Sequence, residues 1–200
     1  MIAIIDYDTG NLRSVCNALE RIGAEYCLTD DPQVIAKADR VLLPGVGEAS
    51  TAMAKLQERG LCEVITSLKV PVLGICIGMQ LMCKHSEEGN VDCMGIFDAD
   101  VKKFEPYPEA GVKVPHMGWN VLSVLHTKLF DGLSDGTYVY FVHSFAADVS
   151  NDSIAVSANG RLFSAALNKD NFYGVQFHPE KSGDVGLNIL RAFCDMEASA

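Results

Sequence analysis

The chain has 200 residues, of which 48% are hydrophobic and 21% charged, and its formal net charge is −10. This length can bury one sizeable core, so we expect a single domain. An acidic chain without clustered Lys and Arg is a poor candidate for nucleic-acid binding. No segment reaches the length of a membrane span, and the start "MIAIID" lacks the features of a secretory signal. Seven cysteines without a CxxC pair indicate free thiols in a reducing cytoplasm.

Strands and helices alternate along the first half of the chain. We expect strands at residues 2–6, 25–29, 40–43 and 70–76, and helices at residues 11–23, 31–39, 49–60 and 78–85. Asp31 is the expected N-cap of the second helix, and Pro32 occupies its first position. This alternation predicts βαβ units and a parallel sheet that helices cover on both faces.

The second half has a different pattern, with short apolar runs separated by turn residues. The expected strands are 95–104, 120–126, 137–148, 153–159, 162–168 and 172–178, and a last helix is expected at 182–196. Such strands would extend or flank the parallel core in antiparallel fashion. The whole chain is therefore predicted to be one mixed α/β domain.

One of the seven cysteines has a setting that the others lack. Cys76 ends the apolar run "VPVLGIC", with Gly74 and Gly78 two positions to either side. It therefore falls at a sharp strand-to-helix turn, at the carboxyl end of a parallel strand, where open α/β sheets bind ligands. Such a nucleophile elbow strains its central residue and crowds side chains two positions away, so glycines fit there. The next helix N-terminus favours a reactive thiolate, although a small buried thiol in a packing turn is the plain alternative.

A nucleophilic thiol needs a base, and the segment "GVQFHPE" supplies the best candidate. If 172–178 is a strand, residues two apart point to the same side, so His178 and Glu180 can meet. Pro179 keeps His178 out of the helical region. The carboxylate would orient the imidazole and stabilise its cation, as the third member of a catalytic triad does. A strand end with a surface His and Glu is the alternative interpretation.

The segment "LLPGVG", residues 42–47, ends another expected parallel strand with two glycines. Acyl chemistry at a thiol needs backbone N–H groups aimed at the developing oxyanion, and a glycine-rich turn can bring its amides close. A phosphate-binding loop is a rival, but no Lys-Ser/Thr follows and the G-x-G-x-x-G spacing is absent. An ordinary strand-to-helix turn is the third interpretation.

Three motifs in this order, "PGVG", "GICIGMQ" and "GVQFHPEKS", resemble the class I (triad) glutamine amidotransferases. The resemblance implies a three-layer α/β fold, with a mixed sheet, helices on both faces and a flavodoxin-like core, as one amidotransferase domain over residues 1–200. It also implies glutamine hydrolysis to glutamate and ammonia through a cysteinyl thioester. The segments "GNLRSV", "PHMGWN" and "YFVHSF" are similar to the class I glutaminases that serve imidazole glycerol phosphate synthases in histidine biosynthesis.

The resemblance implies a role for each matching residue. Cys76 would be the nucleophile, His178 the base and Glu180 the group that orients the base. The amide of Ile77 and that of Val46 or Gly47 would hold the oxyanion. The residues that match the substrate pocket are Gly47, Gln80, Glu88, His143, Ser144 and Phe145. Those that match the face toward the synthase partner are Asn11, Trp119, Asn120 and Lys181, although Trp119 fits core packing and Lys181 a solvated charge equally well.

The sequence departs from the family pattern at a few positions. Asp8 and Thr9 stand where a glycine and another small residue are usual, so we expect the loop before Asn11 to differ in shape. Ile77 replaces a leucine, which matters little for a backbone donor. Phe145 replaces a tyrosine and lacks its hydroxyl.

The resemblance further implies a partner, a (β/α)8-barrel cyclase that forms a heterodimer with this chain and receives the ammonia. The chain ends soon after its last expected helix, so we expect the barrel to be a separate protein. No metal and no organic cofactor is implied, and the expected location is the cytoplasm.

Three other functions remain open from the sequence. A glutaminase of another pathway, such as aminobenzoate or anthranilate synthesis, would share the triad, but "PHMGWN" argues against it. A freestanding cysteine hydrolase or peptidase would not need Gln80 and Glu88. A non-catalytic regulatory subunit would normally have lost a member of the triad, and all three are present.

Overall fold

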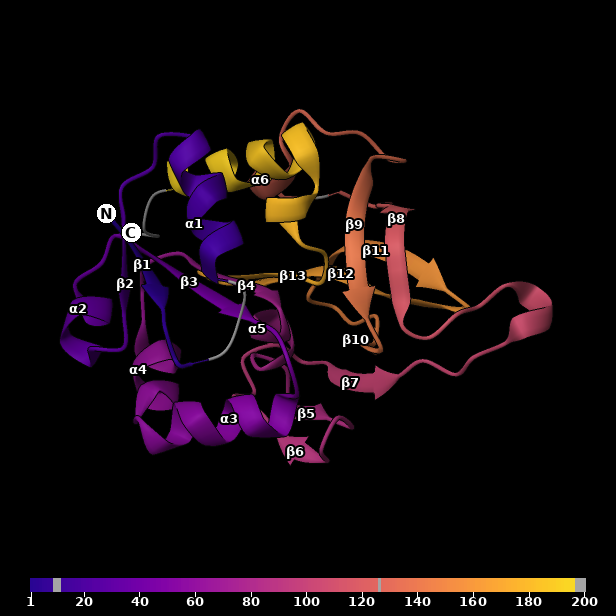
Figure 1. Cartoon of the computed structure of the whole chain (residues 1–200), viewed down its shortest axis with the longest axis horizontal. Coiled ribbons are helices and arrows are strands. Elements are labelled where there is room, and N and C mark those ends of the chain that lie inside the picture. The colour runs from indigo at the N-terminus through magenta and orange to yellow at the C-terminus, as the bar shows by residue number, and fades with distance from the viewer. Residues whose placement is uncertain (9–11, 126, 197–200) are drawn as a thin grey trace.

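The computed structural model describes residues 1–8, 12–125 and 127–196. A seven-stranded sheet runs through the middle of the molecule, with helices on both faces (Figure 1). On one face lie α1 (Leu12–Arg21) and α6 (Gly183–Asp195), and on the other lie α2 (Pro32–Ala36), α3 (Ala49–Glu58) and α4 (Leu61–Ser67). The predicted three-layer α/β fold is confirmed.

The central sheet is mixed. In spatial order its strands are Ser153–Asn159 (β11), Arg161–Lys169 (β12), Phe172–Val175 (β13), Val72–Cys76 (β4), Arg40–Gly45 (β3), Ile2–Ile5 (β1) and Tyr26–Thr29 (β2). The strands from β13 to β2 pair in parallel, and β11 and β12 extend the sheet with antiparallel pairing. The inner parallel strands are buried along their length, which explains their continuous apolar runs.

Two smaller sheets stand beside the carboxyl ends of the parallel strands. One has the order β10 (Phe145–Ala147), β7 (Asp100–Lys103), β5 (His85–Ser86) and β6 (Val91–Asp92). The other is an antiparallel pair of β8 (His116–Val121) and β9 (Tyr138–His143). Short 3-10 helices occupy Pro108–Ala110, Lys128–Phe130 and Pro179–Lys181.

The helices follow from local signals. Val15, Cys16, Ala18 and Leu19 form the buried face of α1. α2 begins as predicted, because the Asp31 carboxylate accepts a hydrogen bond from the backbone N–H of Gln33 at 2.8 Å. The helix expected at 78–85 has only four residues, α5 (Ile77–Gln80), since the chain then turns to pair β5 with β7.

The strands of the second half exist, but several of their predicted bounds are wrong. The strand expected at 120–126 lies at His116–Val121, and His126 is outside the described residues. The strand expected at 137–148 is interrupted at Ser144, which separates β9 from β10. The strands expected at 95–104 and 172–178 are shorter, at Asp100–Lys103 and Phe172–Val175.

Two glycines beside Cys76 allow backbone to touch backbone. A Cβ atom on Gly78 would lie 1.8 Å from the carbonyl oxygen of Leu43 in β3. A Cβ atom on Gly74 would lie 2.7 Å from the carbonyl carbon of Gly78. No larger residue fits either position, but the crowding comes from Leu43, Met82 and the Gly78 backbone and not, as expected from the sequence, from Cys76.

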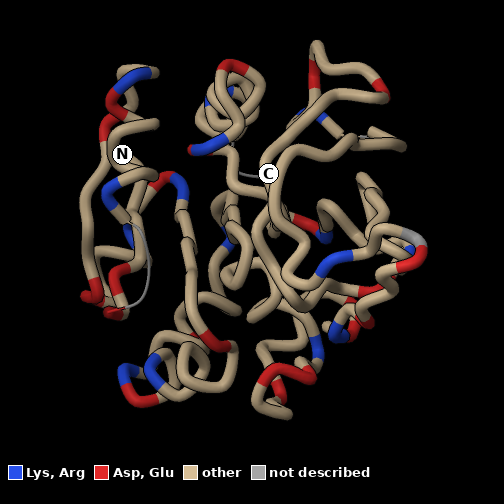
Figure 2. Tube along the Cα trace, turned by 45° about the vertical axis from the view of Figure 1, so that its right-hand side comes forward, with Lys and Arg blue, Asp and Glu red and all other residues tan. Residues whose placement is uncertain are grey.

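Charged residues are dispersed over the outer helices and loops, where Lys and Arg alternate with Asp, Glu and neutral stretches (Figure 2). Within the described residues, none of the helices is both long enough and apolar enough to span a membrane.

Candidate active site

Cys76 lies at the strand-to-helix turn that the sequence predicts. It is the last residue of β4, it pairs with Gly45 of β3, and α5 begins at the next residue. Its backbone has φ 54° and ψ −111°, a conformation that residues with a side chain rarely adopt. The structure therefore shows the strained elbow directly, with the thiol at the carboxyl edge of the sheet.

His178 and Glu180 are in contact, although the route differs from the expected one. β13 ends at Val175, and Glu180 belongs to the 3-10 helix Pro179–Lys181, so the two residues are not alternate positions of a strand. The tight turn still places Oε1 of Glu180 2.8 Å from Nδ1 of His178. His178 itself is extended, with φ −102° and ψ 97°, as a residue before proline prefers.

The ring of His178 lies between two groups that favour its charged form. Nδ1 contacts Oε1 of Glu180, and His178 and Cys76 line the same cavity. Burial lowers the pKa of His178, but the hydrogen bonds and negative charges of Cys76 and Glu180 outweigh burial and raise the pKa to about 10. The site therefore favours the imidazolium form of His178 beside Cys76.

Four of the other thiols lie where burial disfavours the charged thiolate form. Burial raises the pKa of Cys62, Cys83, Cys93 and Cys194, and it brings that of Cys93 to about 12. A protonated thiol is a poor nucleophile. These four cysteines are therefore structural in character.

A cavity of about 310 Å³ opens beside the thiol, a volume that suits a small molecule. It is lined by Val46, Gly47, Cys76, Ile77, Gln80, Glu88, Pro115, Val142, His143, Ser144, Phe145, His178 and Lys181. Every residue predicted for the oxyanion and the substrate is among them. A larger cavity, of about 750 Å³, lies at the amino ends of β4 and β13 near Pro71 and Asn171 and contains no predicted site residue.

The three predicted oxyanion residues, Val46, Gly47 and Ile77, all line this cavity. Ile77 is the first residue of α5, so its N–H has no partner within the helix. Val46 and Gly47 follow β3 directly, and Gly47 has φ 100°, a value that favours glycine. The two donor segments thus border the same cavity as Cys76.

Gln80 and Glu88 present different atoms to the cavity. The side-chain amide nitrogen of Gln80 donates to the carbonyl oxygen of Phe145 at 2.9 Å and to Oε1 of Gln176 at 2.8 Å. Its Oε1 is buried and has no hydrogen-bond partner in the structure. Oε2 of Glu88 accepts from the backbone N–H of Ala49 at 3.0 Å, and burial raises the pKa of this carboxyl.

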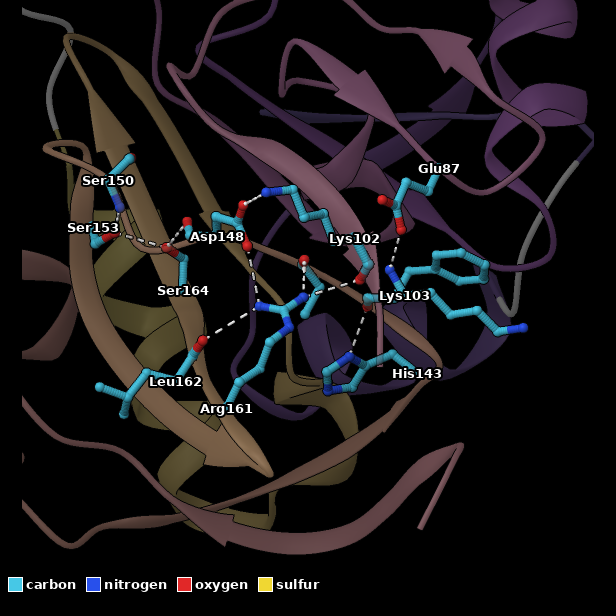
Figure 3. A network of polar contacts seen from close by, with 12 residues as sticks. Glu87, Lys102, Lys103, His143, Asp148, Ser150, Ser153, Arg161, Leu162 and Ser164 are labelled. Carbon is cyan, nitrogen blue, oxygen red and sulfur yellow. Dashed lines mark hydrogen bonds and ion pairs between the residues drawn. The ribbon is translucent and has the colours of Figure 1, made fainter. Parts of the chain in front are cut away.

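The wall formed by His143, Ser144 and Phe145 is fixed from two sides. Nδ1 of His143 lies 2.8 Å from the carbonyl oxygen of Phe145. On the other side, the Arg161 guanidinium donates to the carbonyl oxygen of Ala146 at 3.1 Å and pairs with Asp148 at 3.2 Å (Figure 3). Both contacts hold β10 in place.

Two of the residues predicted to face a partner are exposed and a third is half-buried. Trp119 is 55% exposed and packs edge-on against Tyr140, so it does not belong to the core. Lys181 is exposed, with Nζ 5.9 Å from the centre of the Tyr140 ring. Asn120 is half-buried and donates to the carbonyl oxygen of Ala158 at 2.9 Å. Asn11 lies outside the described residues.

Several residues at the site were missed from the sequence, among them Gln176, Pro115 and Val142. Gln176 is fully buried, and its Nε2 atom lies 3.6 Å from Sγ of Cys76. Strand alternation gives no signal for Gln176, because β13 ends at Val175 and the chain bends at residues 176 and 177. In the part of the chain that the structure describes, no group of three or more His, Cys, Asp or Glu side chains is placed to hold a metal ion.

Comparisons with known proteins agree with this geometry. The family model for glutamine amidotransferase class-I matches residues 3–196. Imidazole glycerol phosphate synthase subunit HisH of Bacteroides fragilis strain YCH46 is 54% identical over 195 residues, which is 98% of this chain and 99% of that protein. The protein of the same name from Escherichia coli strain K12 is 48% identical over 197 residues, with the same coverage.

A solved structure supports the fold alone. The crystal structure of a putative GMP synthase subunit from Thermoplasma acidophilum has a TM-score of 0.73 and 23% identity. The match covers 96% of this chain and 90% of that chain.

Proposed function

Because this chain belongs to the class-I glutamine amidotransferase family, we propose that it is the glutaminase subunit of an imidazole glycerol phosphate synthase. In this proposal the chain hydrolyses glutamine to glutamate and ammonia as a single domain. The observation that carries it is the strained Cys76 beside a His178 that is paired with Glu180. The identity to relatives of that name over nearly the whole chain selects the pathway, histidine biosynthesis.

The proposed reaction uses the three groups in sequence. The Cys76 thiolate attacks the side-chain carbonyl carbon of glutamine, and the C–N bond breaks as the His178 imidazolium gives its proton to the leaving nitrogen. Ammonia departs and a thioester remains. The neutral imidazole then takes a proton from water as the water oxygen attacks the thioester. The C–S bond breaks, glutamate is released, and the Cys76 thiolate and His178 imidazolium are regenerated. Glu180 orients the ring and stabilises its cation throughout.

The cavity provides the remaining proposed roles. The amides of Ile77 and of Val46 or Gly47 stabilise the oxyanion in both steps. Gln80 and Glu88 line this cavity and would hold the amino-acid end of glutamine, with the Glu88 carboxylate pairing with its α-ammonium group. His143, Ser144 and Phe145 form the opposite wall.

We also propose that ammonia passes to a (β/α)8-barrel cyclase partner in a cytoplasmic heterodimer. Support comes from the exposed Trp119 and from Lys181, which is exposed and also lines the cavity. A partner seated on these residues would therefore lie at the mouth of the site. Asn120 follows Trp119 in β8, and the family resemblance implies a contact of Asn11 with the same partner.

Glutamate formation tests the proposal most directly. We expect little glutamate from the isolated chain, more after addition of a barrel cyclase, and most when its acceptor substrate is also present. The Val46 and Gly47 peptide planes can reorient at low cost next to glycine. One misplaced oxyanion donor lowers the rate by about 10²–10³-fold. Equal rates in all three samples would favour a freestanding hydrolase instead.

A further inference from the structure

The carbonyl oxygen of Phe145 fixes the direction of a buried hydrogen-bond chain. It accepts from Nε2 of Gln80 at 2.9 Å and from Nδ1 of His143 at 2.8 Å. A carbonyl can only accept, and these two donors use both of its lone pairs. The orientation of the Gln80 amide and the tautomer of His143 are therefore both determined by this one atom.

The first arm of the chain leads to the thiol. Because Gln80 must present its nitrogen to Phe145, the atom of Gln176 that lies 2.8 Å from this nitrogen must be the oxygen. The Gln176 amide nitrogen then necessarily points the other way, toward Sγ of Cys76 at 3.6 Å. Gln176 is fully buried, and its backbone N–H is fixed by the carbonyl oxygen of Ala165 at 2.9 Å.

The second arm leads away from the thiol to β8. Since Nδ1 of His143 carries the hydrogen, its Nε2 accepts from Nδ1 of His116 at 3.0 Å. Nε2 of His116 in turn accepts from the side-chain amide of Asn120 at 3.1 Å. Each link has a single allowed direction, so the second arm holds the Phe145 carbonyl, and with it the Gln80 amide, in one arrangement.

We propose that Gln176 is a positioning residue for the nucleophile, whose amide N–H stabilises the Cys76 thiolate. The inference rests on the proposed role of Cys76 as the nucleophile. It adds the Gln176 amide to His178 as a second hydrogen-bond donor for the Cys76 sulfur. The sulfur then faces the His178 imidazolium on one side and a neutral amide donor on another. A donor to the charged form of a group favours that form, and burial strengthens the effect.

The test measures the pH profile of Cys76 alkylation by iodoacetamide in the isolated chain, read at the Cys76 peptide by mass spectrometry. Gln176→Met keeps the side-chain length and removes the donor, and Gln57→Met on the exposed face of α3 is the matched control. We expect the midpoint of the profile to rise by about one pH unit in Gln176→Met. The control should superimpose on the unmodified chain.

A second variant separates the hydrogen bond from mere packing. Gln176→Glu has the same shape, still accepts from Gln80, and places a carboxylate oxygen against the sulfur. The proposal predicts that its midpoint rises further than that of Gln176→Met, whereas a packing role predicts a smaller change in the variant of identical shape. Superimposable profiles, or the reverse order, would overturn the proposal. Failure of the glutaminase function appears separately, as a lack of glutamate formation by the unmodified chain with its partner.

Discussion

Glu180 places its Oε1 atom 2.8 Å from Nδ1 of His178, across the start of a 3-10 helix. Both side chains are nearly inaccessible, with 3% and 4% of their surface exposed. The turn is anchored at both ends, because the N–H of His178 donates to the carbonyl oxygen of Tyr140 and the Ser182 hydroxyl donates to that of His178. The backbone that carries the two side chains is therefore fixed on both sides of the contact.

Glu180→Gln should keep the fold and lower the rate of glutamate formation by roughly 10³-fold or more. Glutamine can still accept from Nδ1 of His178, but it no longer carries the negative charge that stabilises the imidazolium. Single-turnover thioester formation measures this step, and Glu58→Gln on an exposed turn of α3 is the control. An unchanged rate of thioester formation would contradict the role of Glu180.

Cys76→Ala should abolish glutamine hydrolysis, with a loss on the order of 10⁶-fold, because no other group can form the thioester. The complex with the barrel partner should still use added ammonia, since the thiol only generates it. Comparing synthesis from glutamine with synthesis from ammonium salt measures both effects. Residual glutamine turnover by the variant complex would assign the nucleophile elsewhere.

Gly78→Ala should destabilise the protein by about 3 kcal/mol or more, because the added methyl group meets the Leu43 carbonyl oxygen at 1.8 Å. Gly132→Ala is the comparison, since its Cβ would meet nothing within 4 Å and only its φ of 79° is strained. Urea unfolding of both variants gives the two free energies. Similar losses of unfolding free energy in the two variants would show that the turn at Cys76 accommodates a methyl group at position 78.

Stability should fall as the pH drops below about 6.5. Burial lowers the pKa of His143 to about 3, so between that value and the ordinary value of 6.5 the unfolded chain binds a proton that the folded chain does not. This histidine contributes a loss of about 1.4 kcal/mol per pH unit within that window. Urea unfolding at several pH values gives the free energy of unfolding as a function of pH. Its slope between about pH 3 and 6.5 should be shallower for His143→Gln than for His85→Gln. Equal slopes would show that groups other than His143 cause the loss of stability at low pH.

The sequence predicts the parallel half of the fold better than the rest, and the reason is visible in single strands. β1, β3 and β4 are continuous apolar runs because both of their faces are buried. β8 reverses the usual alternation, since His116 is buried while Met117 and Trp119 are 63% and 55% exposed. Its position was therefore predicted too late in the chain.

Some residues of the candidate site could be predicted from the sequence and others could not. Cys76, His178 and Glu180 stand in motifs whose spacing carries chemical meaning, and the structure brings them together. Gln176 and His116 belong to the site through contacts with residues far away in the chain, which no local pattern reports. Helix α4 was not predicted from the sequence. Gly60 indicates the end of a helix, but α4 begins at the very next residue, with Gly60 as its N-cap.

The contact between Gly78 and the Leu43 carbonyl also limits how the site can move. β3 cannot slide along β4 without driving that carbonyl into the first turn of α5, so the strand and the elbow form one stationary frame. A rearrangement of Val46 and Gly47 must then be a rotation of peptide planes beyond Gly45. A partner that binds this segment therefore needs to rotate only a few peptide planes and need not displace the sheet. Such local loop motions take roughly nanoseconds to microseconds.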